Sequence, residues 1–195
     1  SLQRSSRRRH GWLRRRLAAV LLVAGLVALG RVIPWTEVVS PRPEGLPSGA
    51  SSLTITNLSE LEVVDGDTIR MRGELIRLLG VDTPEQATPF FRGDQEPWAS
   101  RARELVEGRL SEASVVELRL AAGRDRFGRR LGHVLADDHP VAVDLLEAGL
   151  GYETVSRFGD AGFPELAATI LAAAEEAPEP AFEHPSDWRR RHRIE

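Results

Sequence analysis

Apolar and polar residues alternate with a period of two in several short segments, which is the pattern of half-buried β-strands. Two further segments are almost continuously apolar, as expected of more deeply buried strands. Later segments instead carry apolar residues at helical spacing. The predicted strands are residues 53–64, 68–72, 75–81, 116–120 and 131–136, and the predicted helices are residues 96–110, 140–150 and 164–176.

The order of these elements is strands, helix, strands, helix, helix. It predicts an α+β fold, mainly a small antiparallel β barrel with helices packed around it. Gly73-Glu74 separates the segments 68–72 and 75–81 and predicts a turn, so these two segments should form a β-hairpin.

The N-terminus has a different pattern. Two arginine triplets precede an apolar run of 14 residues, Leu17 to Gly30. A full membrane span needs roughly 20 residues, so the length favours a secretory signal, whereas the imperfect cleavage site Ala28-Leu29-Gly30 favours an uncleaved anchor helix. In either interpretation the arginines stay on the inner side of the membrane and the rest of the chain is exported. We therefore expect an extracytoplasmic protein, membrane-anchored or secreted, whose N-terminal segment meets the membrane or the export machinery.

Composition shifts divide the chain into four parts. A stretch rich in Pro, Gly and Ser predicts a linker after the apolar segment, and a stretch rich in Arg predicts a solvated basic tail at the end. The predicted parts are residues 1–35 (basic segment and hydrophobic helix), 36–51 (linker), 52–177 (folded domain) and 178–195 (tail). We expect the whole protein to be a monomer.

The formal net charge of −3 conceals a strong asymmetry. Residues 1–31 contain eight arginines and no acid, so the remainder holds 18 arginines against 29 acids, a net charge of −11. A domain that binds nucleic acid by bulk electrostatics should be basic. Any nucleic-acid binding must therefore depend on a local cationic cleft, a metal ion, or both. The absence of cysteine excludes disulfides, thiolate nucleophiles and Cys-based zinc sites.

Two short runs carry the most informative chemistry. Residues 63–68 read VVDGDT, and residues 77–85 read RLLGVDTPE. Each run alone is an ordinary turn or strand exit. Together they contain four carboxylates that would repel one another unless a cation lay between them, and hard oxygen ligands suit Ca²⁺ or Mg²⁺. The predicted hairpin places Asp67 beside Asp82, so one cation could bridge the pair.

Arginines near these acids suggest a phosphate ligand. Arg77 lies within an apolar strand, where a charge needs an anionic partner. A second cluster, residues 124–130, is either a solvated turn or the source of a second guanidinium for the same phosphate. The combination indicates metal-assisted chemistry on a phosphate ester.

These motifs resemble the staphylococcal nuclease (thermonuclease-like) family. The matching stretches are VVDGDT, RLLGVDTPE, EPWASRARELVEGRL and DRFGRRLGHVLADD, in the family's order, within about residues 53–176. The resemblance implies an OB-fold barrel of five strands with three helices. It also implies a Ca²⁺-dependent nuclease that cleaves phosphodiesters in DNA or RNA, breaks the bond to the 5′ oxygen and leaves 3′-phosphates.

The resemblance assigns roles to the metal residues. Asp67 and Asp82 match calcium-binding carboxylates, and Thr83 matches a position whose backbone carbonyl is a further ligand. Asp65 matches an acid that supports these ligands.

It also assigns catalytic roles. Glu85 matches the carboxylate that positions or deprotonates the attacking water, and Arg77 and Arg129 match the two phosphate-binding arginines. A glutamate is ionised at pH 7, so Glu85 could accept a proton.

Two other functions fit part of the pattern. The domain could be a non-catalytic OB-fold that binds nucleic acid or protein, or an extracellular domain stabilised by calcium. The first usually lacks several active-site residues, and the second leaves Arg77 and Arg129 without a role. Phe90-Phe91, in the loop after Glu85, either packs on the barrel or stacks on a ligand.

Overall fold

The computed structural model describes residues 48–194, and the account below is confined to them. The strands are β1 (Ser51–Ile55), β2 (Leu61–Asp65), β3 (Thr68–Met71), β4 (Glu74–Leu78), β5 (Val81–Asp82), β6 (Val116–Arg124), β7 (Arg130–Ala136), β8 (His139–Pro140) and β9 (Tyr152–Glu153). The helices are the 3₁₀ helix η2 (Leu58–Glu60) and the α-helices α2 (Trp98–Glu112), α3 (Val141–Glu147), α4 (Val155–Phe158), α5 (Pro164–Glu176) and α6 (Pro185–His192).

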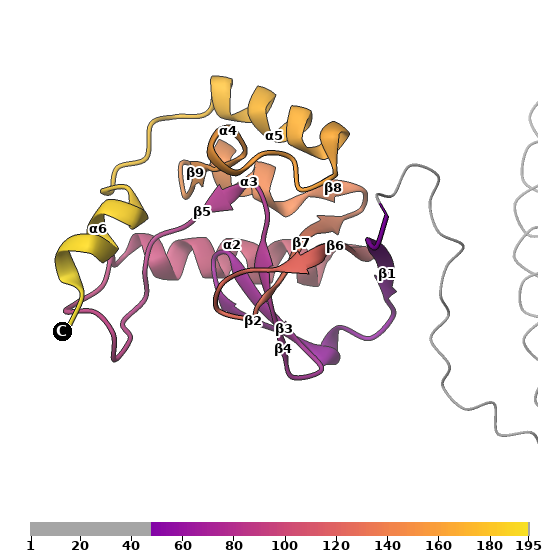
Figure 1. The fold of residues 1–195 in the computed structure, drawn as a ribbon, viewed down its shortest axis with the longest axis horizontal. Coiled ribbons are helices and arrows are strands. Elements are labelled where there is room, and N and C mark those ends of the chain that lie inside the picture. Colours follow the sequence, from indigo (N-terminus) through magenta and orange to yellow (C-terminus); the bar gives the residue numbers. More distant parts are fainter. Residues whose placement is uncertain (1–47, 195) are drawn as a thin grey trace, which may run out of the picture. The chain divides into compact units, whose positions relative to one another are not determined.

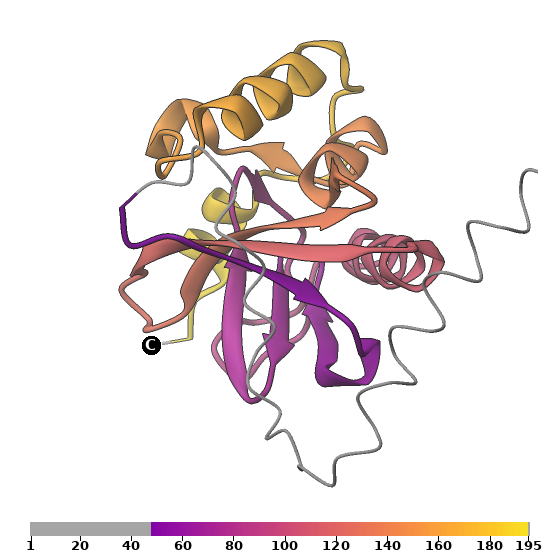
Figure 2. The same cartoon turned by 90° about the vertical axis from the view of Figure 1, so that its right-hand side faces the viewer.

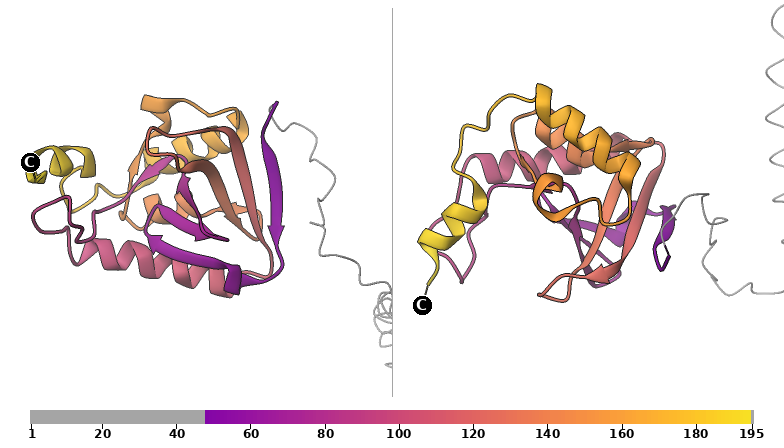
Figure 3. Two further views of the ribbon diagram at one scale, coloured as in Figure 1. Left: turned by 60° about the horizontal axis from the view of Figure 1, so that its bottom comes forward. Right: turned by 45° about the horizontal axis from the view of Figure 1, so that its top comes forward.

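One curled sheet forms the body of the domain (Figures 1 and 2). Its strand order is β1-β6-β7-β4-β3-β2, with β8 attached to β7, and β5 pairs separately with β9. Figure 3 shows the strands curving into a half-barrel with helices packed against it. This α+β, OB-like fold confirms the predicted class. One detail of the prediction is wrong: the sheet is mixed, because β4 and β7 pair in parallel.

The predicted hairpin is confirmed. Strands β3 and β4 pair antiparallel, with Thr68 opposite Arg77 and Met71 opposite Glu74. Arg72 and Gly73 form the turn, both with positive φ (50° and 86°), as a type I′ turn requires. This register places Arg77 opposite the residue that follows Asp67, which brings the two acidic runs together.

Other predicted elements need correction. The segment 53–64 is not one strand, because η2 separates β1 from β2, with the Asn57 side chain capping it. The segment 75–81 is interrupted at Gly80, whose φ is +88°. A Cβ at this position would lie 2.5 Å from Ile170 Cδ1 of α5, so Gly80 also permits close packing. The break directs the chain into β5, where Asp82 pairs with Tyr152.

The core lies between the concave face of the sheet and helices α2, α3 and α5. Alternate residues of β6 are buried, as its sequence pattern predicts, and so are the apolar residues of α3. The three predicted helices correspond to α2, α3 and α5, although α3 ends at Glu147. The largest fully buried side chains include Ile69, Ile76, Leu118, Leu135, Leu145 and Ile170.

The N-terminal predictions fall on residues that the structure does not describe. Both the hydrophobic signal or anchor segment and most of the linker belong to residues 1–47. Within residues 48–194, no helix is both long and apolar enough to span a bilayer.

His133 of β7 is a buried titratable group far from the acidic runs in sequence. Its side chain packs edge-on against Phe163, with ring centroids 5.2 Å apart, and Nδ1 has no hydrogen-bond partner among the described residues. Burial, with a smaller contribution from Arg119, lowers the pKa of His133 to about 4. The imidazole is therefore neutral in the folded protein at neutral pH.

Acid should destabilise the domain through His133. The unfolded chain takes up the proton near the ordinary pKa of about 6.5 and the folded chain only near 4, so stability falls as the pH falls through this window. Between pH 7 and pH 4.5 this one group should cost about 2.5 kcal/mol. Urea unfolding of the wild type and His133→Leu at both pH values measures the difference. His139→Gln, at a partly exposed histidine of β8, is the control. An equal pH dependence of the wild type and His133→Leu would refute the assignment.

Candidate active site

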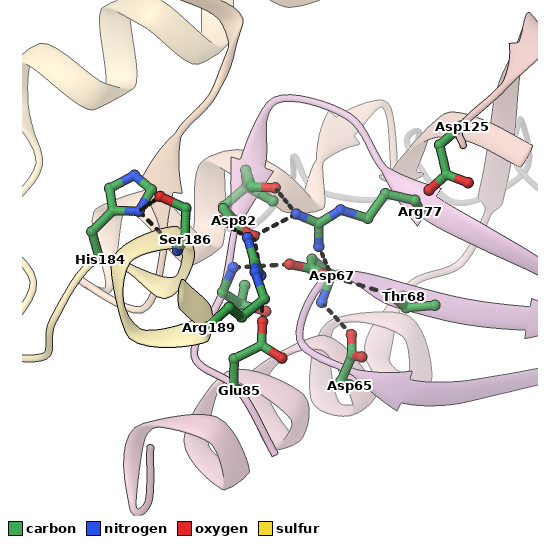
Figure 4. A network of polar contacts seen from close by, with 12 residues as sticks. Asp65, Asp67, Thr68, Arg77, Asp82, Glu85, Asp125, His184, Ser186 and Arg189 are labelled. Carbon is green, nitrogen blue, oxygen red and sulfur yellow. Dashed lines mark hydrogen bonds and ion pairs between the residues drawn. The ribbon is translucent and has the colours of Figure 1, made fainter. Parts of the chain in front are cut away.

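The acidic residues gather where the turn between β2 and β3 meets the segment between β4 and β5. Asp65 ends β2, Asp67 lies in the two-residue turn, and Asp82 ends β5. Gly66 allows this approach, since a Cβ there would lie 2.8 Å from Thr83 Oγ1 and 2.7 Å from Ala102 Cβ. The two runs that are eight residues apart in sequence thus form one cluster (Figure 4).

Both carboxylate oxygens of Asp67 accept hydrogen bonds from neighbouring residues. The backbone N–H of Thr83 donates to Asp67 Oδ2 (2.9 Å), and the Thr68 hydroxyl donates to Oδ1 (3.1 Å). The Asp67 backbone N–H in turn donates to Asp65 Oδ1 (3.0 Å). Asp67 and Thr83 are both buried. Asp65 and Thr83 therefore both help to position Asp67, the first through the Asp67 N–H and the second through its own N–H.

Arg77 joins the two buried aspartates. Its Nη1 pairs with Asp67 Oδ1, and its Nη2 lies 2.6 Å from Asp82 Oδ1 and donates to the Val81 carbonyl at 3.2 Å. The predicted need of this strand arginine for an anionic partner is confirmed. Since one guanidinium contacts both carboxylates, Asp67 and Asp82 face a common space.

Arg189, which the sequence analysis did not select, occupies the other side of Asp82 (Figure 4). Its Nη2 lies 2.8 Å from Asp82 Oδ2, its Nη1 lies 3.2 Å from Asp82 Oδ1, and Nη1 also pairs with Glu85 Oε1. The Glu85 side chain is 18% exposed, so it lies at the edge of the cluster and not deep inside it.

Arg129 lies beside the cluster and does not contact its aspartates directly. It comes from the loop between β6 and β7, where Asp125 Oδ2 accepts from its Nε at 2.8 Å. Its Nη1 lies 3.4 Å from Thr68 Oγ1, the hydroxyl that bonds Asp67. Asp125 and Thr68 thus hold Arg129 next to the acidic cluster. Asp125 and Thr68 are themselves more than 55 positions apart in sequence.

Burial and the neighbouring arginines shift the pKa values of the site's carboxyl groups in opposite directions. Burial raises the pKa of Asp82, but Arg77 and Arg189 outweigh it and leave the pKa below its ordinary value. Burial dominates at Asp65, whose pKa is raised despite Arg77, and at Glu85, whose pKa is raised despite Arg189. The cluster therefore combines Asp82, whose pKa is lowered, with Glu85, whose pKa is raised.

The donors suit a hard divalent cation only in part. Asp67 and Asp82 offer buried carboxylate oxygens around a common space, and oxygen donors are what Ca²⁺ prefers. In residues 48–194, however, no group of three or more His, Asp or Glu side chains is arranged to hold a metal. Two carboxylates and a backbone carbonyl would leave most of the six to eight ligands of Ca²⁺ to water and phosphate.

The prediction of a solvated tail after residue 177 is wrong for the part that the structure describes. Residues 185–192 form α6, and Trp188 is buried against Phe91 and His192. Phe91 therefore packs on α6, whereas Phe90 is 71% exposed. Pro185 at the start of the helix and Asp187 in its first turn are helix signals that could have indicated α6.

Comparison with known proteins agrees with this geometry. Residues 75–179, more than half of the chain, match the family described as staphylococcal nuclease homologue. Helix α6 lies beyond the matched residues, and Asp65 and Asp67 lie before them.

Three curated relatives each match a little under half of the chain. A thermonuclease of Staphylococcus intermedius is 33% identical over 92 residues, 45% of this chain and 54% of the relative. The succinoglycan biosynthesis protein ExoI of Rhizobium meliloti is 34% identical over 95 residues, 47% of this chain and 49% of the relative. An uncharacterized protein of Methanocaldococcus jannaschii is 30% identical over 112 residues, 47% of this chain and 54% of the relative.

The chain thus spans about half the length of the curated relatives it matches. The match to the family as a whole covers β4 from Leu75 onward, β5, helices α2 to α5 and the strands between them. Together with the OB-like sheet and the clustered acids and arginines, this match identifies the kind of domain. This chain belongs to the staphylococcal nuclease homologue family.

Proposed function

We propose that the protein is a Ca²⁺-dependent phosphodiesterase that hydrolyses DNA or RNA to 3′-phosphate products. The observation that carries the proposal is the convergence of Asp67, Asp82, Glu85 and Arg77 on one space, with Arg129 beside it. The arginines distinguish this proposal from a domain that merely binds calcium, because two guanidinium groups next to a cation site match the charges of a phosphate.

The chain's own residues suit the steps of hydrolysis. Arg77 and Arg129 would bind the phosphate and stabilise the added negative charge as water attacks phosphorus. Glu85 would take the proton from that water, and its raised pKa makes its carboxylate a better proton acceptor than that of an ordinary glutamate. The bond from phosphorus to the 5′ oxygen breaks, and that oxygen takes a proton from solvent to become a hydroxyl.

Asp67 and Asp82, with the Thr83 carbonyl, would hold the calcium. When bound, Ca²⁺ would supply Lewis-acid polarisation of a phosphate oxygen. The thermonuclease relative supports this proposal, whereas the name of ExoI, a biosynthesis protein, shows that relatives of similar identity carry different names. The export and membrane attachment expected from residues 1–35 belong to the same proposal.

Removing calcium should abolish hydrolysis. Full-length protein incubated with single- and double-stranded DNA and with RNA should cleave at least one of them in Ca²⁺, and in excess chelator the rate should fall to that of a protein-free blank. Adding Ca²⁺ back should restore the rate, because chelation removes only the cation. Mapping the product ends should show 3′-phosphates.

Two outcomes would contradict the proposal. Undiminished cleavage in chelator would exclude the calcium dependence. Retention of nucleic acid in Ca²⁺ without any cleavage would favour the alternative, a non-catalytic OB-fold that binds nucleic acid or protein.

A further inference from the structure

Helix α6 is held at the active site by specific contacts on both of its ends. Before the helix, Tyr152 Oη donates to the Phe182 carbonyl (2.7 Å), and the Tyr152 ring lies 4.5 Å from that of His184. After it, the Ile194 N–H donates to the Phe90 carbonyl (2.9 Å). Figure 1 shows α6 beside the segment that follows β5. The helix therefore docks in a defined orientation.

Gln95 connects this docking to the catalytic segment. Its side chain is buried, accepts from the Glu85 N–H (3.1 Å) and donates to the Glu183 carbonyl (2.7 Å). Its own N–H donates to the Glu85 carbonyl at 2.8 Å. One side chain thus ties the backbone of Glu85 to the segment that leads into α6, so the position of the helix and that of Glu85 are linked.

Arg189 is the residue that α6 delivers into the cluster. The Arg189 side chain is 33% exposed and pairs with Asp82 and Glu85, whereas the next residue, Arg190, is 74% exposed and pairs only with Asp187 of its own helix. Two arginines that are adjacent in sequence therefore differ completely in their surroundings. Only the first is a partner of active-site carboxylates.

The contacts of Arg189 occupy the oxygens that a cation would need. Asp82 Oδ1 faces both Arg77 Nη2 and Arg189 Nη1, and Asp82 Oδ2 faces Arg189 Nη2. A calcium ion requires a carboxylate oxygen at about 2.3–2.6 Å, and a guanidinium at the same oxygens repels it. Of the two Asp82 carboxylate oxygens, Arg77 contacts Oδ1, and the contact to Oδ2 comes from Arg189. Withdrawal of Arg189 would therefore free Oδ2.

We propose that Arg189 is a further residue of this active site, a counter-cation that docked α6 holds against Asp82 and Glu85 and that calcium displaces. Calcium binding and the docking of α6 by Arg189 then compete. The proposal rests on the proposed function, because it concerns the same calcium site. In the absence of calcium, Arg189 compensates the charges of Asp82 and Glu85; in its presence, Arg189 is released toward solvent or an incoming phosphate.

The test measures calcium binding and helix docking, both without substrate. Isothermal titration calorimetry with Ca²⁺ on the full chain should show that Arg189→Gln lowers the dissociation constant roughly tenfold, as expected when a competing state that is about 90% populated is removed. Arg190→Gln, which makes the same charge change on the same helix, should leave the constant unchanged. A merely structural role of Arg189 would weaken calcium binding, so the direction separates the two.

Hydrogen exchange provides a second, independent measurement. In the wild type, saturating Ca²⁺ should speed exchange of the amides of residues 186–192, and in Arg189→Gln these amides should exchange faster already without Ca²⁺. Equal or weaker calcium binding by Arg189→Gln, or wild-type exchange unaffected by Ca²⁺, would overturn the inference and leave the proposed function intact. Failure of all three proteins to bind Ca²⁺ would overturn both.

Discussion

Glu85→Gln should slow phosphodiester hydrolysis at saturating substrate by about 10²–10⁴-fold, the usual contribution of a general base. The amide has nearly the shape of the carboxylate but cannot accept a proton from the attacking water. Its oxygen can still accept from Arg189, and the backbone bonds of Glu85 to Gln95 do not involve the changed group. We therefore expect kcat to fall with little change in KM or in melting temperature. Initial rates on an oligonucleotide in saturating Ca²⁺ measure both constants.

A matched control separates the loss of the base from the loss of a negative charge. Glu107→Gln removes the same charge from the exposed face of α2, where Glu107 pairs with Arg103, and should hydrolyse at the wild-type rate. Full activity of Glu85→Gln would show that another group, or bulk solvent, takes the proton. Equal losses in both variants would point to net charge and would remove the catalytic role of Glu85.

The hairpin and its acids could be predicted from sequence because the signals are local. Alternation over residues 68–72 and the turn at Gly73 determine the pairing of β3 with β4, and that pairing brings Asp67 and Asp82 together. The parallel pairing of β4 with β7 could not be predicted in this way. It joins segments more than 50 residues apart and depends on how the whole sheet curls.

Arg189 illustrates what sequence patterns leave undetermined in the site. The tail contains Arg189, Arg190, Arg191 and Arg193, and nothing in the local sequence distinguishes the one that reaches Asp82. Helix geometry and the burial of Trp188 make that choice, since together they fix which side of α6 faces the loop after β5. Arg77 could be predicted because a charge between apolar strand neighbours needs a buried partner wherever the strand lies.

Arg77→Met should lower the free energy of unfolding by about 3–5 kcal/mol in the absence of calcium, the usual cost of removing one partner from a buried ion pair. The Arg77 side chain is only 16% exposed, and Asp67 and Asp82 are 7% and 5% exposed. Methionine fills the space of the arginine stem but leaves two buried carboxylates facing each other, of which only Asp82 keeps an arginine in direct contact, Arg189. Urea unfolding in chelator measures the loss. Arg70→Met is the control. Arg70, on β3 of the same hairpin, pairs with Glu62 of β2, which is 62% exposed, and an exposed pair contributes about 0–1 kcal/mol.

Calcium should restore part of the stability lost in Arg77→Met, and it should stabilise this variant more than it stabilises the wild type. A divalent cation between Asp67 and Asp82 relieves the repulsion that the missing guanidinium leaves, and a ligand that binds only the folded state stabilises in proportion to its affinity. The increase in melting temperature with Ca²⁺ should therefore be larger for Arg77→Met than for the wild type or Arg70→Met. If the increase is the same in all three, the carboxylates that Arg77 joins are not those that bind the cation. Because the measurement needs no substrate, it tests the calcium site independently of catalysis.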